Sequence, residues 1–283
     1  MSDAIKPLEE VRREIDEIDS ALHDLIMRRT RVVEQVAAAK GTTNTPNFIP
    51  GREVKVLRRL LSRHEGAFPR HALVRIWREL ISVYAAIQGP FDVVAYAVDG
   101  DQGCWDLARD HYGSHDKMST LATPREVVAR VSSGEAAIGV APVPVEGEGD
   151  AWWRMLCGAV APRIVARLPF IEGSNARNSG VSAYALAKVK PDQTGEDRTL
   201  LVIETDSELS RDGLRSLVSD AGLETRLIVT DRQDVTAHLI EVDGFFTSED
   251  PVVKALSACD DVRAVFVIGA YGLPIGIGSE VPS

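Results

Sequence analysis

Residues 8–40 read LEEVRREIDEIDSALHDLIMRRTRVVEQVAAAK, and their apolar positions recur at the spacing of an α-helix. The stripe consists of Leu8, Val11, Ile15, Ile18, Leu22, Leu25, Ile26, Val33 and Val36. Pro7 suits the first turn of such a helix, and Gly41 suits its C-terminal cap. The pattern therefore predicts one uninterrupted helix over residues 8–40, about 50 Å long at a rise of about 1.5 Å per residue.

Two shorter helices are predicted behind the long one. One begins after Pro50 and runs to about His64, and the other begins at Pro69 and runs to Gln88. The long helix cannot bury its whole apolar stripe under two shorter neighbours of the same chain. We therefore expect residues 1–90 to form an all-α, three-helix domain that assembles as an intertwined homodimer and contains its own core.

Behind Phe91 the pattern changes to short apolar runs that alternate with helical segments, which is typical of α/β architecture. Residues 91–195 are predicted to form a small α/β lobe, and the segment GEDR is the expected linker behind it. Residues 196–283 carry strands and helices in the order βαββαβ, which predicts a ferredoxin-like domain. The final GLPIGIGSEVPS is predicted to be a loose end. The fold class is thus multi-domain.

Composition limits the functions that the chain can have. The formal net charge is −10, yet residues 1–90 hold 15 Lys and Arg against 12 Asp and Glu, so an anionic ligand belongs there. So small an excess fits nucleic acid poorly. Three widely spaced cysteines without a CxxC pair indicate a reducing compartment. We expect a cytoplasmic protein without a signal peptide, a membrane span or a metal-ligand motif.

Four polar residues are predicted to share the core-facing stripes of the three helices: Arg29, Lys40, Glu53 and Gln88. Lys40 follows Arg29 by eleven residues, which is about 20° past three full turns, so both side chains leave the same line of the helix. Buried polar groups of this kind need partners. They could form a structural salt-bridge network, or their long side chains could reach the rim of the dimer. Four together, with an excess of cations, favour a pocket for an anion.

The stretch over residues 8–40, GREVKVLRRL at residues 51–60 and RIWRELISVYAAIQ at residues 75–88 resemble the all-helical chorismate mutases. The resemblance implies the unimolecular Claisen rearrangement of chorismate to prephenate, in the biosynthesis of phenylalanine and tyrosine. It also implies that no metal, cofactor or covalent intermediate is needed.

The resemblance further implies which cations bind the substrate. Arg12 and Arg29 would hold the two carboxylates of chorismate, and Arg12 would reach across from the partner subunit. Arg52 would brace the site.

Three other residues are implied to act at the reacting part of the substrate. Lys40 and Gln88 would hydrogen-bond the ether oxygen, and Glu53 would hold the ring hydroxyl. Negative charge grows on that oxygen as the C–O bond breaks, so donors already aimed there stabilise the transition state most. The chain departs from the family at Ile49, where many relatives carry Asp, and near Tyr84, where a small hydroxyl residue is expected.

The remaining chain resembles the bifunctional chorismate mutase/prephenate dehydratases, which carry a dehydratase domain and an ACT regulatory domain. The matching segments are VVARVSSGEAAIGVAPVPVEGEGDAWWRML at residues 127–156 and AHLIEVDGFFTSEDPVVKALSACDDVRAVFVIGAY at residues 237–271. Only one lobe of the dehydratase fits, and its Thr-Arg-Phe motif is replaced by ARNSG. SRDGL and TDRQ stand where phenylalanine-binding relatives carry PGAL-type and ESRP-type motifs. The lobe is thus predicted to be degenerate and the last domain to be ACT-like.

Three functions follow from these observations. The leading interpretation is a chorismate mutase. The first alternative is a bifunctional chorismate mutase/prephenate dehydratase. The second is a non-catalytic helical dimerisation module whose C-terminal domains sense an amino-acid effector or dock another pathway enzyme. The pair Trp152 and Trp153 is predicted to be core and not a ligand platform.

Overall fold

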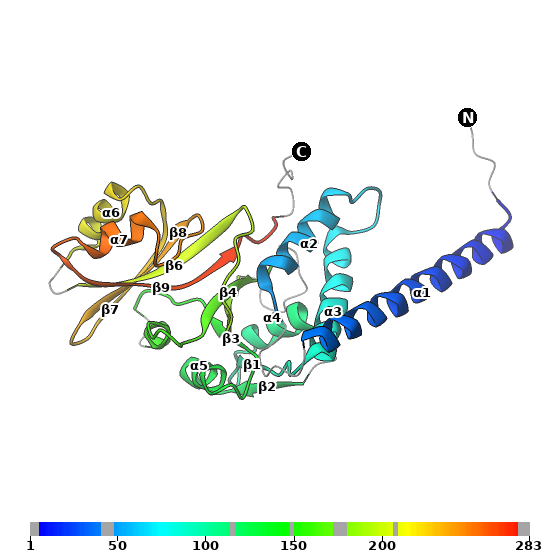
Figure 1. The fold of residues 1–283 in the computed structure, drawn as a ribbon, viewed down its shortest axis with the longest axis horizontal. Helices are drawn as coiled ribbons and strands as arrows, with labels where there is room; N and C mark the ends of the chain where they lie inside the picture. The colour runs from blue at the N-terminus through cyan, green and yellow to red at the C-terminus, as the bar shows by residue number, and fades with distance from the viewer. Residues whose placement is uncertain are drawn as a thin grey trace.

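The structure is a computed structural model in which three helices adjoin a long twisted sheet (Figure 1). It describes residues 6–40, 48–113, 117–147, 150–171, 180–205 and 209–276. No helix among these residues is both long and apolar enough to cross a membrane.

The three predicted helices are confirmed: α1 (Leu8–Lys40), α2 (Pro50–Ser62) and α3 (Arg70–Gln88). Pro50 occupies the first turn of α2, where its missing N–H costs nothing, and Pro69 immediately precedes α3. Local sequence therefore determined where these helices begin.

Helix α1 projects away from the rest of the chain and packs against α3 near its C-terminal end (Figure 1). Near the contact, the Tyr84 hydroxyl of α3 donates a hydrogen bond to the carbonyl of Ile26 over 3.2 Å. The apolar stripe of α1 is open along most of its length: Ile18, Leu22 and Leu25 each expose more than half of their surface. Helix α1 is amphipathic as predicted, but its apolar stripe is not covered in a single chain.

The expectation that residues 1–90 contain their own core is wrong. Val54, Leu57, Leu61 and Val74 of α2 and α3 are buried in one cluster with Phe170, Ile171 and Ile275 of the α/β region. Arg58 of α2 also donates hydrogen bonds to Thr194 Oγ1 over 3.0 Å and to the carbonyl of Leu273 over 3.0 Å. Helix α2 is thus an integral part of the contact with the α/β region.

The nine strands in the described part of the chain belong to one sheet, with the order β2-β1-β3-β5-β4-β9-β6-β8-β7. The strands are β1 (Val93–Tyr96), β2 (Met118–Leu121), β3 (Ile138–Pro142), β4 (Arg163–Leu168), β5 (Ala183–Ala187), β6 (Asp197–Thr205), β7 (Thr225–Arg232), β8 (Thr236–Asp243) and β9 (Val262–Gly272). The helices of this region are α4 (Gly103–Tyr112), α5 (Pro124–Ser133), α6 (Arg211–Asp220) and α7 (Pro251–Ser257), with a short 3-10 helix, η1, at Trp152–Leu156. The predicted βαββαβ order is present in β6 to β9 with α6 and α7.

One hydrophobic cluster runs along a single face of the sheet through both halves. It contains residues from β1, β5, β4, β9, β6, β8 and β7, together with α5 and η1. Helix α4 covers the opposite face of the first half, and α6 and α7 cover it in the second half. Trp152 and Trp153 lie in the shared cluster, nearly free of solvent contact, which confirms that they are core residues. The predicted boundary near residue 195 is therefore crossed by a continuous sheet and a continuous core.

Two further sequence expectations need correction. The 3-10 helix at Trp152–Leu156 was not predicted, because five residues are too few to show a helical period. The C-terminal segment is not loose at its start: Ile275 is buried and bridges to Ile171. The rest of that segment, residues 277–283, lies outside the described residues.

The two halves of the sheet meet where β4 lies parallel to β9, with Ile164 opposite Gly269. A Cβ at Gly269 would overlap the backbone carbonyl of Ile164. We expect Gly269→Ala to lower the free energy of unfolding by about 1–3 kcal/mol, the usual cost of overpacking, as measured by urea denaturation. Gly158→Ala is the matched control, because its Cβ would meet Ala161 only at an ordinary 3.7 Å. Equal stability of the two variants would contradict the tight junction.

Candidate active site

Arg29 of α1 and Gln88 of α3 both adjoin Tyr84. The guanidinium carbon of Arg29 lies 4.3 Å from the centre of the Tyr84 ring. The Gln88 side-chain amide donates to the Tyr84 backbone carbonyl over 2.8 Å, one helical turn back. Tyr84 itself is buried between the two helices. Arg29 thus contacts α3 at Tyr84, the position where the chain departs from the family, while the Gln88 bond stays within its own helix.

Glu53 of α2 lies in a second place, against α3. Its Oε2 atom accepts a hydrogen bond from Nη1 of Arg78 over 2.7 Å, and the side chains of Arg78 and Glu53 are only 4% and 12% exposed. The Arg78 guanidinium carbon also lies 4.9 Å from the centre of the Phe170 ring. Glu53, which is predicted to bind the ring hydroxyl of the substrate, is therefore already one half of a buried ion pair. This agrees with the alternative that the buried polar residues form structural salt bridges.

Burial dominates the electrostatics of this pair. It raises the pKa of Glu53 to about 7, although the charge of Arg78 pulls in the opposite direction. Burial likewise lowers the pKa of Arg78, against the attraction of Glu53. The protonation of the Glu53 carboxyl group, with its pKa at about 7, thus changes close to neutral pH.

The other predicted residues are placed as follows. Arg12 is exposed on α1 and pairs with Glu9 over 2.8 Å. Arg52 is exposed at the start of α2. Lys40 is the last residue of α1, and its side chain lies outside the described part of the chain. Arg29 was predicted to face a core, but it is exposed in the single chain, where its guanidinium contacts the Tyr84 ring of α3.

Arg78 is the residue that sequence reasoning missed. It belongs to the buried residues of α3 with Val74, Ser82 and Ala85, which recur at helical spacing. A charged residue on that line was a usable signal. The apolar stripe around Trp77 lies on a neighbouring face of the same helix.

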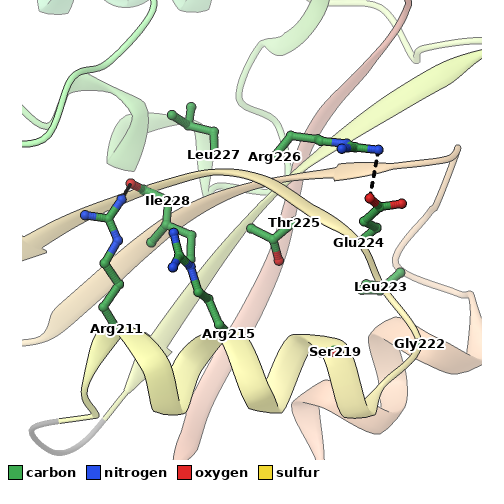
Figure 2. A pocket seen from close by; sticks show the side chains of 10 residues that line it. All are labelled: Arg211, Arg215, Ser219, Gly222, Leu223, Glu224, Thr225, Arg226, Leu227 and Ile228. Carbon is green, nitrogen blue, oxygen red and sulfur yellow. Dashed lines mark hydrogen bonds and ion pairs between the residues drawn. The ribbon is translucent and has the colours of Figure 1, made fainter.

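A hollow with a volume of about 620 Å³ lies far from these residues, between α6 and β7 (Figure 2). Arg211 and Arg215 extend from α6 toward β7, and Arg211 donates to the Ile228 carbonyl over 3.1 Å. Arg226 on the other side pairs with Glu224 over 2.9 Å. Because these arginines are exposed and two of them are already paired, the hollow carries no chemistry for the predicted reaction. The described residues also hold no cluster of three His, Cys, Asp or Glu that could bind a metal ion.

Comparison with known families decides the identity of the helical part, since residues 11–89 match the family model described as chorismate mutase type II. This part of the chain is a chorismate mutase type II domain. It contains α2 and α3 entire and all of α1 behind its first turn.

Known relatives extend the similarity beyond the chorismate mutase domain. The chain is 30% identical over 149 residues to the bifunctional chorismate mutase/prephenate dehydratase of Aquifex aeolicus, a match that covers 51% of this chain and 41% of the relative. It is 31% identical over 173 residues to the enzyme of the same description from Pseudomonas aeruginosa, covering 56% of this chain and 47% of the relative. This chain therefore spans less than half of the length of these relatives. Among solved structures, the prephenate dehydratase of Arthrobacter aurescens matches 68% of this chain and 92% of its own, at 13% identity and a TM-score of 0.46.

Proposed function

We propose that the chain is a chorismate mutase that converts chorismate to prephenate by a Claisen rearrangement. The observation that carries the proposal is the chorismate mutase type II domain over residues 11–89. Its three helices hold Arg29, Lys40, Glu53 and Gln88, whose residue types suit the reaction.

The reaction needs a dianion held in a compact conformation and donors at one ether oxygen. Fixing the conformation removes part of the barrier as an orientation effect. A cation and an amide, Lys40 and Gln88, stabilise the charge that develops on the oxygen as the C–O bond breaks. Arg12 and Arg29 neutralise the carboxylates, with Arg52 bracing them. Glu53 accepts a hydrogen bond from the ring hydroxyl.

The active form is a homodimer in which α1 of one chain covers α1 of the other. The apolar residues of the first half of α1 alternate at spacings of three and four: Leu8, Val11, Ile15, Ile18, Leu22 and Leu25. This is the spacing of a coiled-coil seam. An exposed stripe of this length on a helix of 33 residues marks an interaction surface. A second copy fits it because the pattern is the same on both helices.

The α/β region behind the mutase domain is proposed to be a degenerate dehydratase-like lobe followed by an ACT-like domain. Its βαββαβ order supports the second half of that proposal. An amino-acid effector or a pathway enzyme as its partner stays a prediction, and the hollow between α6 and β7 is the first place to test for one.

The function is tested by incubating the purified chain with chorismate and following the ultraviolet absorbance of chorismate, with and without acid conversion of prephenate to phenylpyruvate. We expect chorismate to disappear and prephenate to accumulate at neutral pH. Phenylpyruvate above the spontaneous background would instead support the bifunctional alternative, which the similarity to the bifunctional relatives favours. If the chorismate concentration does not change, the non-catalytic dimerisation module is the remaining interpretation.

A further inference from the structure

Arg78 and Phe170 join the mutase domain to the α/β region at the residue that is proposed to bind the substrate hydroxyl. Arg78 lies between the two partners: its Nη1 atom is 2.7 Å from Glu53 Oε2, and its guanidinium carbon is 4.9 Å from the Phe170 ring centre. With 4% of its side chain exposed, Arg78 can exchange little of this contact for water. Its position is therefore set by these two neighbours.

Phe170 is in turn fixed by the end of the sheet. The backbone N–H of Ile275, three residues behind β9, donates to the carbonyl of Phe170 over 2.7 Å, and Ile171 bridges to Ile275. All three residues are buried in the cluster that also holds Val54 and Leu57 of α2. A continuous set of contacts thus leads from the sheet through Phe170 and Arg78 to Glu53.

From this geometry we propose that Arg78 is the positioning residue for Glu53, and that Phe170 of the α/β region holds Arg78 in place. The inference rests on the proposed mutase function of Glu53 and extends it, because residues outside the chorismate mutase domain then complete the site. Arg78 touches no reacting atom in this scheme. It keeps Glu53 in one orientation and favours its ionised form, which is the stronger acceptor for a hydroxyl group.

Asp110 of α4 lines the same hollow as Arg78 but pairs with Arg75 over 3.3 Å. Among the described residues, two further titratable groups interact with the pair, and neither is charged near neutral pH. They are His111 and Tyr112 of α4, and His111 and Phe170 contact each other edge to face. Burial lowers the pKa of His111 well below 6.5, so that the ring stays neutral. Burial raises the pKa of Tyr112 above its usual range. A titration near pH 7 at this place therefore reports Glu53.

The test is the titration of Glu53 in the full chain. We expect kcat/KM for chorismate in the wild type to rise with pH through a midpoint at about 7, as Glu53 ionises. Arg78→Met removes the stabilising charge and should move the midpoint upward by about one to three pH units. The carboxyl ¹³C resonance of Glu53, assigned by its loss in Glu53→Gln, should move with it. A variant that loses activity equally at every pH, with an unchanged midpoint, would overturn the proposal.

Arg75→Met is the matched control. Arg75 lies on the same helix, one turn earlier, and pairs with Asp110 over 3.3 Å instead of Glu53. The substitution removes the same charge from α3 and should leave the midpoint within about 0.3 pH unit of the wild type, because a partly exposed charge that does not touch Glu53 is screened by solvent. An equal shift in both variants would show that only the net charge matters, and would overturn the proposal.

The role of Phe170 is tested by a double-mutant cycle. Phe170→Leu keeps an apolar side chain but removes the ring, and should lower kcat/KM about two- to thirty-fold, the range of a cation–π contact. In the Arg78→Met background it should change kcat/KM less than about two-fold, because its target is gone. Equal factors in both backgrounds would overturn this half of the proposal. If Arg78→Met does not fold, Arg78→Gln, which also removes the charge but keeps a hydrogen-bond donor toward Glu53, serves as the second background, with the same expected loss of the Phe170 effect.

The proposed function and this inference fail in different ways. If the wild-type chain leaves chorismate unchanged, the mutase function is wrong. The ¹³C titration of Glu53 still decides whether Arg78 and Phe170 control that carboxyl group.

Discussion

Replacing Lys40 with alanine is expected to lower kcat for chorismate conversion about 10²- to 10³-fold, the usual cost of losing one donor to developing negative charge. Lys40 is the last residue of α1. The charge that it would meet is present only in the transition state, so kcat and kcat/KM should fall together. Steady-state kinetics of the purified variant measure both.

The matched control is Lys55→Ala. Lys55 is exposed on α2 and follows Glu53 by two residues, about 200° around the helix, so it leaves the opposite side. Its replacement should change kcat less than about two-fold, as expected for a surface residue. Circular dichroism should show that both variants keep the wild-type helix content. Unfolding of Lys40→Ala alone would favour a structural salt bridge over a catalytic role.

Most helices and strands could be predicted from the sequence because each has a strong local signal. The bounds of α1 follow from an unbroken apolar period, and Pro50 and Pro69 mark the starts of α2 and α3. The union of the two halves in one sheet could not be predicted. It depends on the pairing of Ile164 with Gly269, which are more than 100 residues apart. No local pattern encodes such a register.

The candidate site was predictable only as a set of residue types. Helical spacing placed Arg29 and Gln88 on stripes expected to face a core, and in the structure Arg29 lies on the Tyr84 ring while Gln88 bonds back to its own helix. The partner of Glu53 was not predictable, since the ion pair with Arg78 depends on how α2 packs on α3. The contact between Phe170 and Arg78 was even harder to predict, because Phe170 follows the three helices by about 80 residues in the α/β region.

The apolar stripe on α1 cannot be explained by the contacts of a single chain. The apolar period of α1 correctly predicted a helix with one apolar side. That side is exposed in the single chain, and a second copy of the chain is proposed to cover it. The position of Arg12 also points to a second copy of the chain. It precedes Arg29 by 17 residues, about 25 Å along the helix and about 100° around it. One small molecule cannot touch both residues of the same α1.

The last prediction follows from that distance. Arg12→Ala and Lys40→Ala chains should each be nearly inactive, and mixing them under conditions of subunit exchange should restore activity. In a shared site, Arg12 of one chain serves the Lys40 of its partner, so one site of each mixed dimer receives both intact residues. At most about a quarter of wild-type activity should return, since random exchange makes half of the dimers mixed and each of these has one intact site of two.

Chorismate consumption measures the recovery, and mass spectrometry of differently labelled chains confirms the exchange. If Arg12 served the site of its own chain, every site in the mixture would lack one residue. Confirmed exchange without recovered activity would therefore contradict the shared site.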